Sequence, residues 1–227
     1  MLLLVAEQTN SWMKFQDSNQ TLAHLVELRA ATAVPVSQAQ RASLNKAGMV
    51  FIVTTWEAYV EDVAREAAEH IARHTASYAD LPRPLKTIIS DGVRRQNNPP
   101  WSAADIADDG WRELVTRNAY EKTHQGAFNT PSSTKVRKLF QDTTGLTDVT
   151  SSWGWQGFSA PGPAERLDET IEIRGEIVHT GGKPDGLAKG WLDTYGGNVA
   201  RLVDRTDLAV RAHACEVTGV PMTDPFP

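Results

Sequence analysis

The stretch "AGMVFIVTTWEAYV" (residues 47–60) decides the fold. It is apolar on nearly every side of a helical wheel, so a helix that contains it should be buried all round. Its β-branched run would also suit a strand, but turns rich in Ala, Glu and Arg flank it, and its length favours a helix. We therefore expect one long central helix over residues 38–74.

Segments with helical spacing of apolar residues lie on both sides of this central helix. Pro and Gly residues give start and stop signals for several of them. We expect helices over 6–31, from Pro84 onward, and over 108–122, 129–145, 164–180 and 186–214. The inward face of the last helix should carry Leu192, Tyr195, Val199, Leu202 and Leu208. A Gly-, Ser- and aromatic-rich connector covers 151–163, and neither repeats nor a strand series are evident.

These segments predict an all-α fold, a bundle of long antiparallel helices with an irregular helical insertion. A length of 227 residues fits a single domain over 1–227, with 75–130 as a possible elaboration and 218–227 as a tail.

The composition is that of an ordinary globular protein, with 41% hydrophobic and 22% charged residues. The net charge of -5 argues against nonspecific coating of nucleic acid but leaves room for a local basic site. The one cysteine, Cys215, permits no internal disulfide and fits a reducing compartment. The opening "MLLLVA" is too short for a signal peptide, and no apolar stretch reaches membrane-spanning length. We expect a cytoplasmic protein with no membrane contact.

The stretch "IEIRGEIVHTGG" (residues 171–182) places a charge where the helical pattern expects an apolar residue. Leu167, Ile171 and Val178 form a narrow apolar stripe, and Arg174 falls inside it. A charged group on a core-facing stripe costs several kcal/mol unless it is paired. Glu57 is the charged residue in the 47–60 run, so we hypothesise that Glu57 and Arg174 meet in the core.

His179 follows Arg174 by five residues, which gives an Arg-x4-His pattern. An arginine can hold a phosphate and a histidine can move a proton near neutral pH. The same spacing is also common as a surface arginine followed by a histidine at a helix end. An ideal helix places residues five apart about 140° around its axis. For both to act on one phosphate, either the helix unwinds at His179 or a second copy completes the site.

Three ordered segments and a tryptophan-bearing connector resemble the HEPN superfamily, in particular its RiboL-PSP branch. The segments are "NKAGMVFIVTTWEAYVEDVARE", "NTPSSTKVRKLFQDTTG" and "LDETIEIRGEIVHTGG", and the likeness covers roughly residues 10–205. The resemblance implies a helical bundle, frequent dimerisation and, in many members, metal-independent RNA cleavage in toxin–antitoxin, phage-defence or stress systems. It places Arg174 and His179 in the catalytic positions. RNA, a second copy of the chain and a cognate antitoxin protein are the partners it implies.

The chain departs from many active members at Gly175, where they carry a small polar residue after the arginine. Glu176 is a candidate substitute, so Glu57 and Glu176 are the supporting residues of the predicted site. Two alternatives stay open. One is a catalytically inactive HEPN module that dimerises or binds a nucleotide or protein partner, and the other is a helical scaffold.

Basic and aromatic residues outside the motif could contact RNA. The candidates are Lys135, Arg137 and Lys138, and the aromatic residues Trp153, Trp155 and Phe158. A solvated helix face and core packing are the respective alternatives. His70 and His74 have a spacing that can bind a metal, but no third ligand is evident. We expect neither a metal nor another cofactor.

Overall fold

Seven α-helices and no strands make up the regular structure of the residues described in this computed structural model, which are 8–30, 37–94, 106–124, 126–159, 161–181 and 190–222. Short 3-10 helices cover Tyr78–Asp80 and Val149–Ser152. The helices are α1 (Asn10–Ala30), α2 (Gln38–His74), α3 (Arg83–Arg94), α4 (Gly110–Thr123), α5 (Ser133–Thr144), α6 (Pro161–Thr180) and α7 (Trp191–Thr218).

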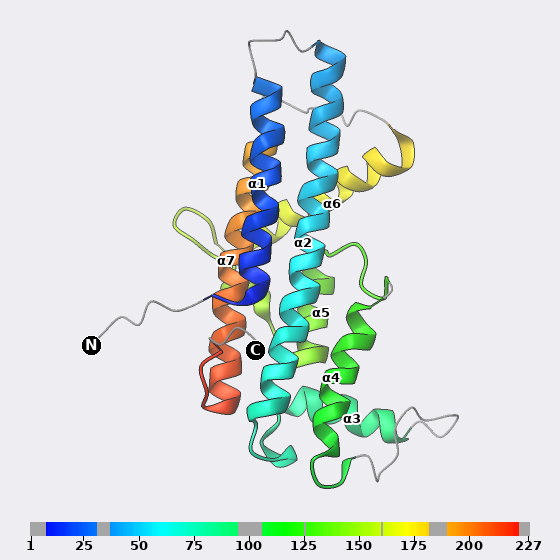
Figure 1. The fold of residues 1–227 in the computed structure, drawn as a ribbon, viewed down its shortest axis with the longest axis vertical. Helices are drawn as coiled ribbons and strands as arrows, with labels where there is room; N and C mark the ends of the chain where they lie inside the picture. Colours follow the sequence, from blue (N-terminus) through cyan, green and yellow to red (C-terminus); the bar gives the residue numbers. More distant parts are fainter. Residues whose placement is uncertain are drawn as a thin grey trace, which may run out of the picture.

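Three long helices run along the length of the molecule (Figure 1). α1 and α2 are antiparallel neighbours, and α7 packs on both and runs in the direction of α2. α6 crosses this bundle obliquely behind α2, while α3, α4 and α5 gather around the second half of α2. The result is the predicted all-α bundle.

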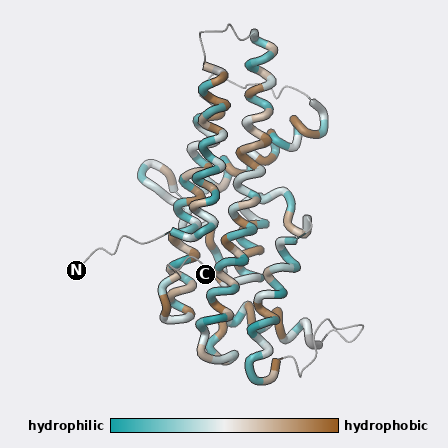
Figure 2. Tube along the Cα trace, in the orientation of Figure 1, coloured by the Kyte–Doolittle hydropathy of each residue, from teal (hydrophilic) through white to brown (hydrophobic). Residues whose placement is uncertain are grey.

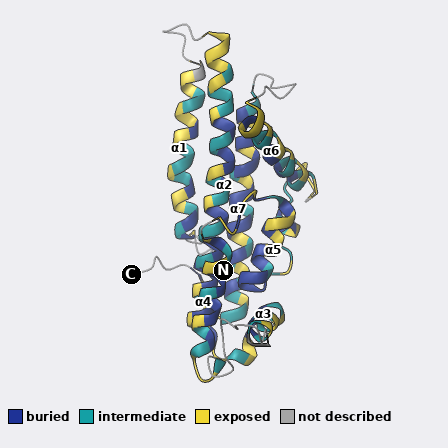
Figure 3. Cartoon of the chain, turned by 90° about the vertical axis from the view of Figure 1, so that its right-hand side faces the viewer, coloured by how far each residue is buried: buried dark blue, intermediate teal, exposed yellow. Residues whose placement is uncertain are grey.

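The central position of α2 follows from its sequence. It packs against α1, α4, α5, α6 and α7, so it needs apolar residues on several sides. Met49, Val60 and Ala67 are fully buried, and Trp56 is the centre of the aromatic core. Its ring lies 5.9 Å from that of Trp153, with the planes close to perpendicular. Buried residues follow α2 through the middle of the bundle, whereas its first turns are exposed (Figure 3).

Close helix packing requires small residues where α7 meets its neighbours. A Cβ on Gly48 of α2 would lie 2.8 Å from Leu192, and one on Gly196 would lie 2.9 Å from Leu22 of α1. Hydrophobic and hydrophilic residues alternate along these helices, as expected for helices that bury one face (Figure 2). The helix faces that meet are therefore apolar and, at two points, lack a side chain.

The helix predictions agree well with the observed bounds. The predicted 38–74 helix is confirmed as α2, with Ser37 as its N-cap. The helix expected at Pro84 begins at Arg83, and that expected over 164–180 already begins at Pro161. Residues 6–7, 31 and 186–189 of the first and last predicted helices lie outside the described residues.

Two residues predicted to face inward are exposed. Val178 of α6 is 51% exposed, and so is Leu208 of α7. The α6 stripe is buried at Leu167 and Ile171 only, because the residue that packs inward in the last turn of this oblique helix is Ile177, which is 8% exposed, and not Val178. Leu208 lines an open groove instead of the core. Within the described segments, we find no helix with the length and apolar character that a membrane span requires.

Candidate functional site

The loop before α5 connects three helices at the position of the predicted site. The indole Nε1–H of Trp56 in α2 donates to the carbonyl of Pro131, at 3.0 Å. The backbone N–H of Thr130 hydrogen-bonds the carboxylate of Glu57, the next residue of α2. Thr130 has a φ of 57°, which is unusual for a β-branched residue. The loop is therefore held in a fixed conformation against α2.

Asp168 of α6 binds the start of α5. Its carboxylate accepts a hydrogen bond from the Ser133 backbone N–H at 2.7 Å and another from the Ser133 hydroxyl at 2.6 Å. A carboxylate at a helix N-terminus also interacts favourably with the helix dipole. Ser132, the N-cap of α5, accepts from the Lys135 N–H. Asp168 thus fixes α6, and with it Arg174, relative to α5 and α2.

Glu57 and Arg174 lie within electrostatic reach of each other between α2 and α6. Burial raises the pKa of the Glu57 carboxyl above its usual value of 4.5, and the positive charge of Arg174 is the strongest influence that opposes this rise. The Thr130 amide and Lys135 lower the same pKa to a smaller extent. Both Glu57 and Arg174 are half-buried, so the expectation that they meet in the closed core is wrong. They lie at the edge of the bundle.

Glu61 extends the acidic side of this site by one helical turn. Burial raises its pKa to about 7, and the negative charge of Glu57 four residues earlier adds to the effect. Arg65 opposes the rise, while Asp62 adds to it. The carboxyl of Glu61 therefore exchanges its proton close to neutral pH, beside the pair formed by Glu57 and Arg174.

Arg174 has hydrogen-bonding capacity that the protein itself does not use. Its Nε atom is buried and has no hydrogen-bond partner. An unpaired buried donor costs about 1–3 kcal/mol, and such exceptions occur at functional sites more often than elsewhere. The guanidinium thus lies within electrostatic reach of Glu57 and has at least one unsatisfied donor.

The helix that carries Arg174 stays regular through His179. α6 ends at Thr180, and the N–H of Gly181 bonds to the carbonyl of Ile177 at 3.1 Å. Lys46 of α2 donates to the Gly181 carbonyl at 2.6 Å and so secures the end of α6. His179 and Glu176 are both exposed. The helix does not unwind at His179, so the side chains of Arg174 and His179 leave it in different directions.

The basic residues of α5 are occupied by neighbouring groups. Lys135 donates to the backbone carbonyl of Asn129 at 2.8 Å. Arg137 pairs with Asp148 at 3.1 Å, and Lys138 pairs with Asp142. These contacts agree with the alternative that this is a solvated helix face. The charge of Lys135 also lowers the pKa of Glu57 slightly.

The two tryptophans of the connector have different environments. Trp153 is fully buried, and its indole donates to the Thr206 hydroxyl at 2.9 Å, so it is a core residue and does not present a face to RNA. Trp155 is half-buried beside a surface groove. The ring centres of His70 and His74 lie 4.6 Å apart with their planes tilted by 43°, but the described residues contain no cluster of three or more potential metal ligands.

Sequence reasoning missed Asp168, Ser133 and Glu61. Ser133 stands one residue beyond an N-cap signal, and Glu61 is one helical turn from Glu57, so both positions carried a local signal. Asp168 carried none, because its partner is 35 residues away in the chain.

A comparison with family models identifies RiboL-PSP-HEPN over residues 14–211, which is most of the chain. No curated protein and no solved structure matches. The matched range includes α2, the α5 loop and the whole of α6, and so contains every residue of the candidate site.

Proposed function

Because the chain belongs to the RiboL-PSP-HEPN family, we propose that it is a metal-independent endoribonuclease that acts as a homodimer. The observation that carries the proposal is Arg174, whose guanidinium lies beside Glu57 with a buried Nε–H that lacks a partner. A guanidinium with unsatisfied donors is suited to phosphoryl oxygens. We further propose a role as a toxin, phage-defence or stress effector, with an antitoxin protein as the neutralising partner.

The proposed reaction needs only groups that the chain supplies. The ribose 2′-oxygen attacks the adjacent phosphorus, a P–O2′ bond forms, and the P–O5′ bond breaks. The products are a 2′,3′-cyclic phosphate and a 5′-hydroxyl end. His179 takes the proton from the 2′-hydroxyl or donates one to the leaving 5′-oxygen, which is worth about 10²–10⁴-fold in rate. Arg174 stabilises the negative charge on the phosphoryl oxygens.

A second copy of the chain is needed to bring the two groups together. Residues five apart on a regular helix point about 140° apart, and α6 is regular to Thr180. His179 is exposed, and the adjacent Val178 is 51% exposed, which supports an interface at this end of α6. In a symmetric dimer, Arg174 of one copy would meet His179 of the other across an isologous contact.

Glu57 acts in this proposal as a positioning residue. It would orient the Arg174 guanidinium through the attraction between their charges, and the Thr130 amide bonds to its carboxylate. Glu176, the other supporting candidate, is exposed on the last turns of α6 and would contribute through the dimer interface.

The proposal is tested by incubating end-labelled RNA with purified protein in excess EDTA. Wild type should yield fragments with cyclic phosphate ends, and His179→Ala should yield none. His24→Ala, which removes another exposed histidine, from α1, is the matched control and should cleave like wild type. Cleavage that survives His179→Ala, or that stops in EDTA, would contradict the assignment.

The inactive module for dimerisation or partner binding is a second candidate, favoured by Gly175. Gly175 contributes no side chain to the site, although no atom lies within 4 Å of the place where a Cβ would stand and a side chain would have room there. A folded, dimeric wild type that cleaves none of several RNAs, and that a host tolerates as well as the His179→Ala variant, would favour this second function.

A further inference from the structure

A tight turn in the connector presents two aromatic rings beside α7. The backbones of Trp155 and Phe158 pair through two hydrogen bonds, of 3.0 and 2.8 Å. Gly157 between them has a φ of 87°, which favours glycine and makes the reversal possible. The two rings lie 5.8 Å apart. We call residues 155–158 the aromatic turn.

Arginines flank both rings of the aromatic turn. The Arg201 guanidinium lies 5.5 Å from the centre of the Trp155 ring, and that of Arg166 lies 5.0 Å from the Phe158 ring. Such contacts hold a cation against the face of an aromatic ring. Phe158 is 39% exposed, so this surface is accessible to a ligand.

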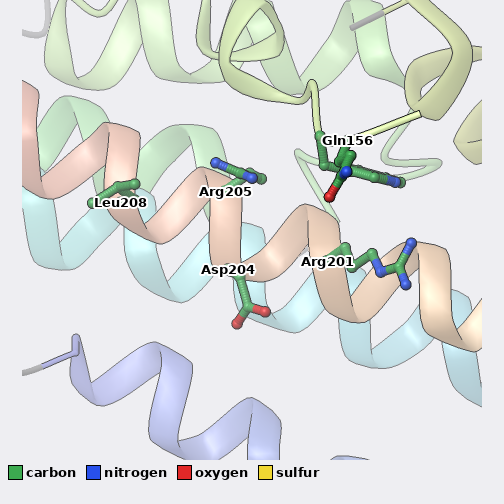
Figure 4. Close-up of a pocket in the computed structure, with 6 residues that line it drawn as sticks. Gln156, Arg201, Asp204, Arg205 and Leu208 are labelled. Carbon is green, nitrogen blue, oxygen red and sulfur yellow. The ribbon is translucent and has the colours of Figure 1, made fainter. Parts of the chain in front are cut away.

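A groove of about 520 Å³ separates the aromatic turn from α7. Its lining residues are Trp155, Gln156, Arg201, Asp204, Arg205 and Leu208. Arg201 and Arg205 are one helical turn apart, and Figure 4 shows both on the stretch of α7 beside Gln156. The volume falls within the ordinary range for small-ligand sites.

The side chains of Arg201 and Arg205 make the groove positively charged, because the one carboxylate in its lining is directed elsewhere. Asp204 points away from the aromatic turn toward α1 (Figure 4), where it accepts a hydrogen bond from the Trp12 indole at 2.8 Å. Among the described residues, neither the Arg201 nor the Arg205 guanidinium forms an ion pair. The two arginines therefore retain their donors on a chain whose net charge is -5.

The wall of the groove also contains an unsatisfied donor. The Nε1–H of Trp155 is buried and has no hydrogen-bond partner, in contrast to that of Trp153, which bonds to Thr206. Leaving this donor unpaired costs about 1–3 kcal/mol. The groove thus combines the half-buried indole of Trp155, whose N–H is unsatisfied, with two guanidinium groups that form no ion pair within the described part of the chain.

We propose that this groove binds a nucleotide unit, with the base against the aromatic turn and the phosphate on Arg201 and Arg205. Aromatic rings stack on any base, and guanidinium groups match phosphate geometry. The nucleotide comes either from a free mononucleotide or from an RNA strand bound to the protein. Binding here does not require that the protein cleave RNA.

The groove is remote from the Arg174 site. The aromatic turn precedes α6, and Arg174 is 13 residues into that helix, or about 20 Å at the α-helical rise. The turn lies beside α7 on one side of the bundle, and the end of α6 projects on the other (Figure 1). Binding at the groove and chemistry at Arg174 can therefore be measured separately.

The test uses the full chain carrying His179→Ala, so that RNA stays intact, and measures binding of AMP and of a fluorescent single-stranded oligoadenylate. The Arg201→Ala, Arg205→Ala double variant should raise the Kd of the bound probe about tenfold or more, as should Trp155→Ala at the aromatic residue that lines the groove, since stacking is worth about 1–3 kcal/mol per base. Arg41→Ala, Arg83→Ala removes two exposed arginines from α2 and α3 and is the matched control, expected to change Kd less than about twofold.

Comparable affinity for AMP and the oligonucleotide identifies a free-nucleotide site, whereas binding of the oligonucleotide alone identifies an RNA-strand site. The proposal is overturned if neither probe binds, if the control variant weakens binding equally, or if pyrophosphate competes as well as AMP does. A wild type that cleaves no RNA but binds through the groove would overturn the proposed ribonuclease function and leave this inference standing.

Discussion

Arg174 of α6 lies within electrostatic reach of Glu57 of α2 at the edge of the bundle. Burial raises the pKa of the Glu57 carboxyl, and the charge of Arg174 is the strongest influence that opposes this rise. The pair is half-buried, so its partners retain contact with solvent. Such a pair is worth little as a stabilising contact. The attraction between the two charges instead favours a role in orienting the guanidinium.

Replacing Arg174 should therefore separate function from stability. Arg174→Ala should lower the free energy of unfolding by no more than about 1 kcal/mol, because the pair is partly exposed. The same change should abolish RNA cleavage, and Arg174→Lys should restore it only in part, because an ammonium group cannot reproduce the planar fork. Urea denaturation and a cleavage assay on the same preparations provide the measurement. Unfolding of Arg174→Ala with retained cleavage in the residual folded fraction would contradict the assignment.

The raised pKa of Glu61 predicts that the stability of the protein depends on pH. Its pKa is about 7 in the folded chain, against 4.5 for an ordinary glutamate. The folded chain therefore keeps a proton that the unfolded chain has lost, and this contribution to the free energy of unfolding falls as pH rises from about 4.5 to about 7. Glu61→Gln should raise Tm at pH 8 relative to wild type and leave it nearly unchanged at pH 4. Glu172→Gln, at an exposed position of α6, is the control; an equal gain from it would contradict the prediction.

The contact between Asp168 and Ser133 should support both the fold and the site. Asp168→Ala removes a charged acceptor from two donors, at 2.7 and 2.6 Å, and should cost about 1.5–3 kcal/mol. It should also reduce cleavage in the fraction that remains folded, because α6 loses its attachment to α5. Asp17→Ala, at an exposed carboxylate in the middle of α1, should leave both quantities within about 0.5 kcal/mol of wild type. Equal losses from the two variants would show that the contact has no special role.

Two glycines predict opposite responses to the same substitution. Gly175 lies inside α6 with open space around its Cβ position, so Gly175→Ala should stabilise the protein by about 0.5–1 kcal/mol. Gly145 has a φ of 79° at the end of α5, and a Cβ there would overlap that of Pro82. Gly145→Ala should therefore destabilise the protein by more than the first variant stabilises it. Thermal unfolding of both variants is the measurement, and a loss of stability in Gly175→Ala would contradict the described helix.

The positions of the helices could be predicted from the sequence more accurately than the faces that the helices bury. α2 could be predicted because its apolar run needs neighbours on several sides. Val178 could not be placed correctly, because a helical wheel assumes that one face of the helix stays buried along its whole length. α6 instead crosses the bundle obliquely and buries Ile177, not Val178, in its last turn.

The site residues that could be predicted are those that stand out from the pattern of their own helix. Arg174, His179 and Glu57 stand out because each breaks or ends an apolar pattern. Asp168 does not, because its role depends on a contact with α5 that only the tertiary structure creates. The same holds for Trp153 and Trp155, which are alike in sequence and differ only in what packs over them.

The most direct test of the central claim mixes two inactive chains. Arg174→Ala and His179→Ala are co-expressed with different tags, and cleavage of RNA is measured in EDTA. If each site takes Arg174 from one copy and His179 from the other, the mixed dimer retains one intact site. Random pairing should then restore about a quarter of wild-type activity, whereas each variant alone stays inactive. A mixture as inactive as its components, beside an active wild type, would contradict a site shared between two chains.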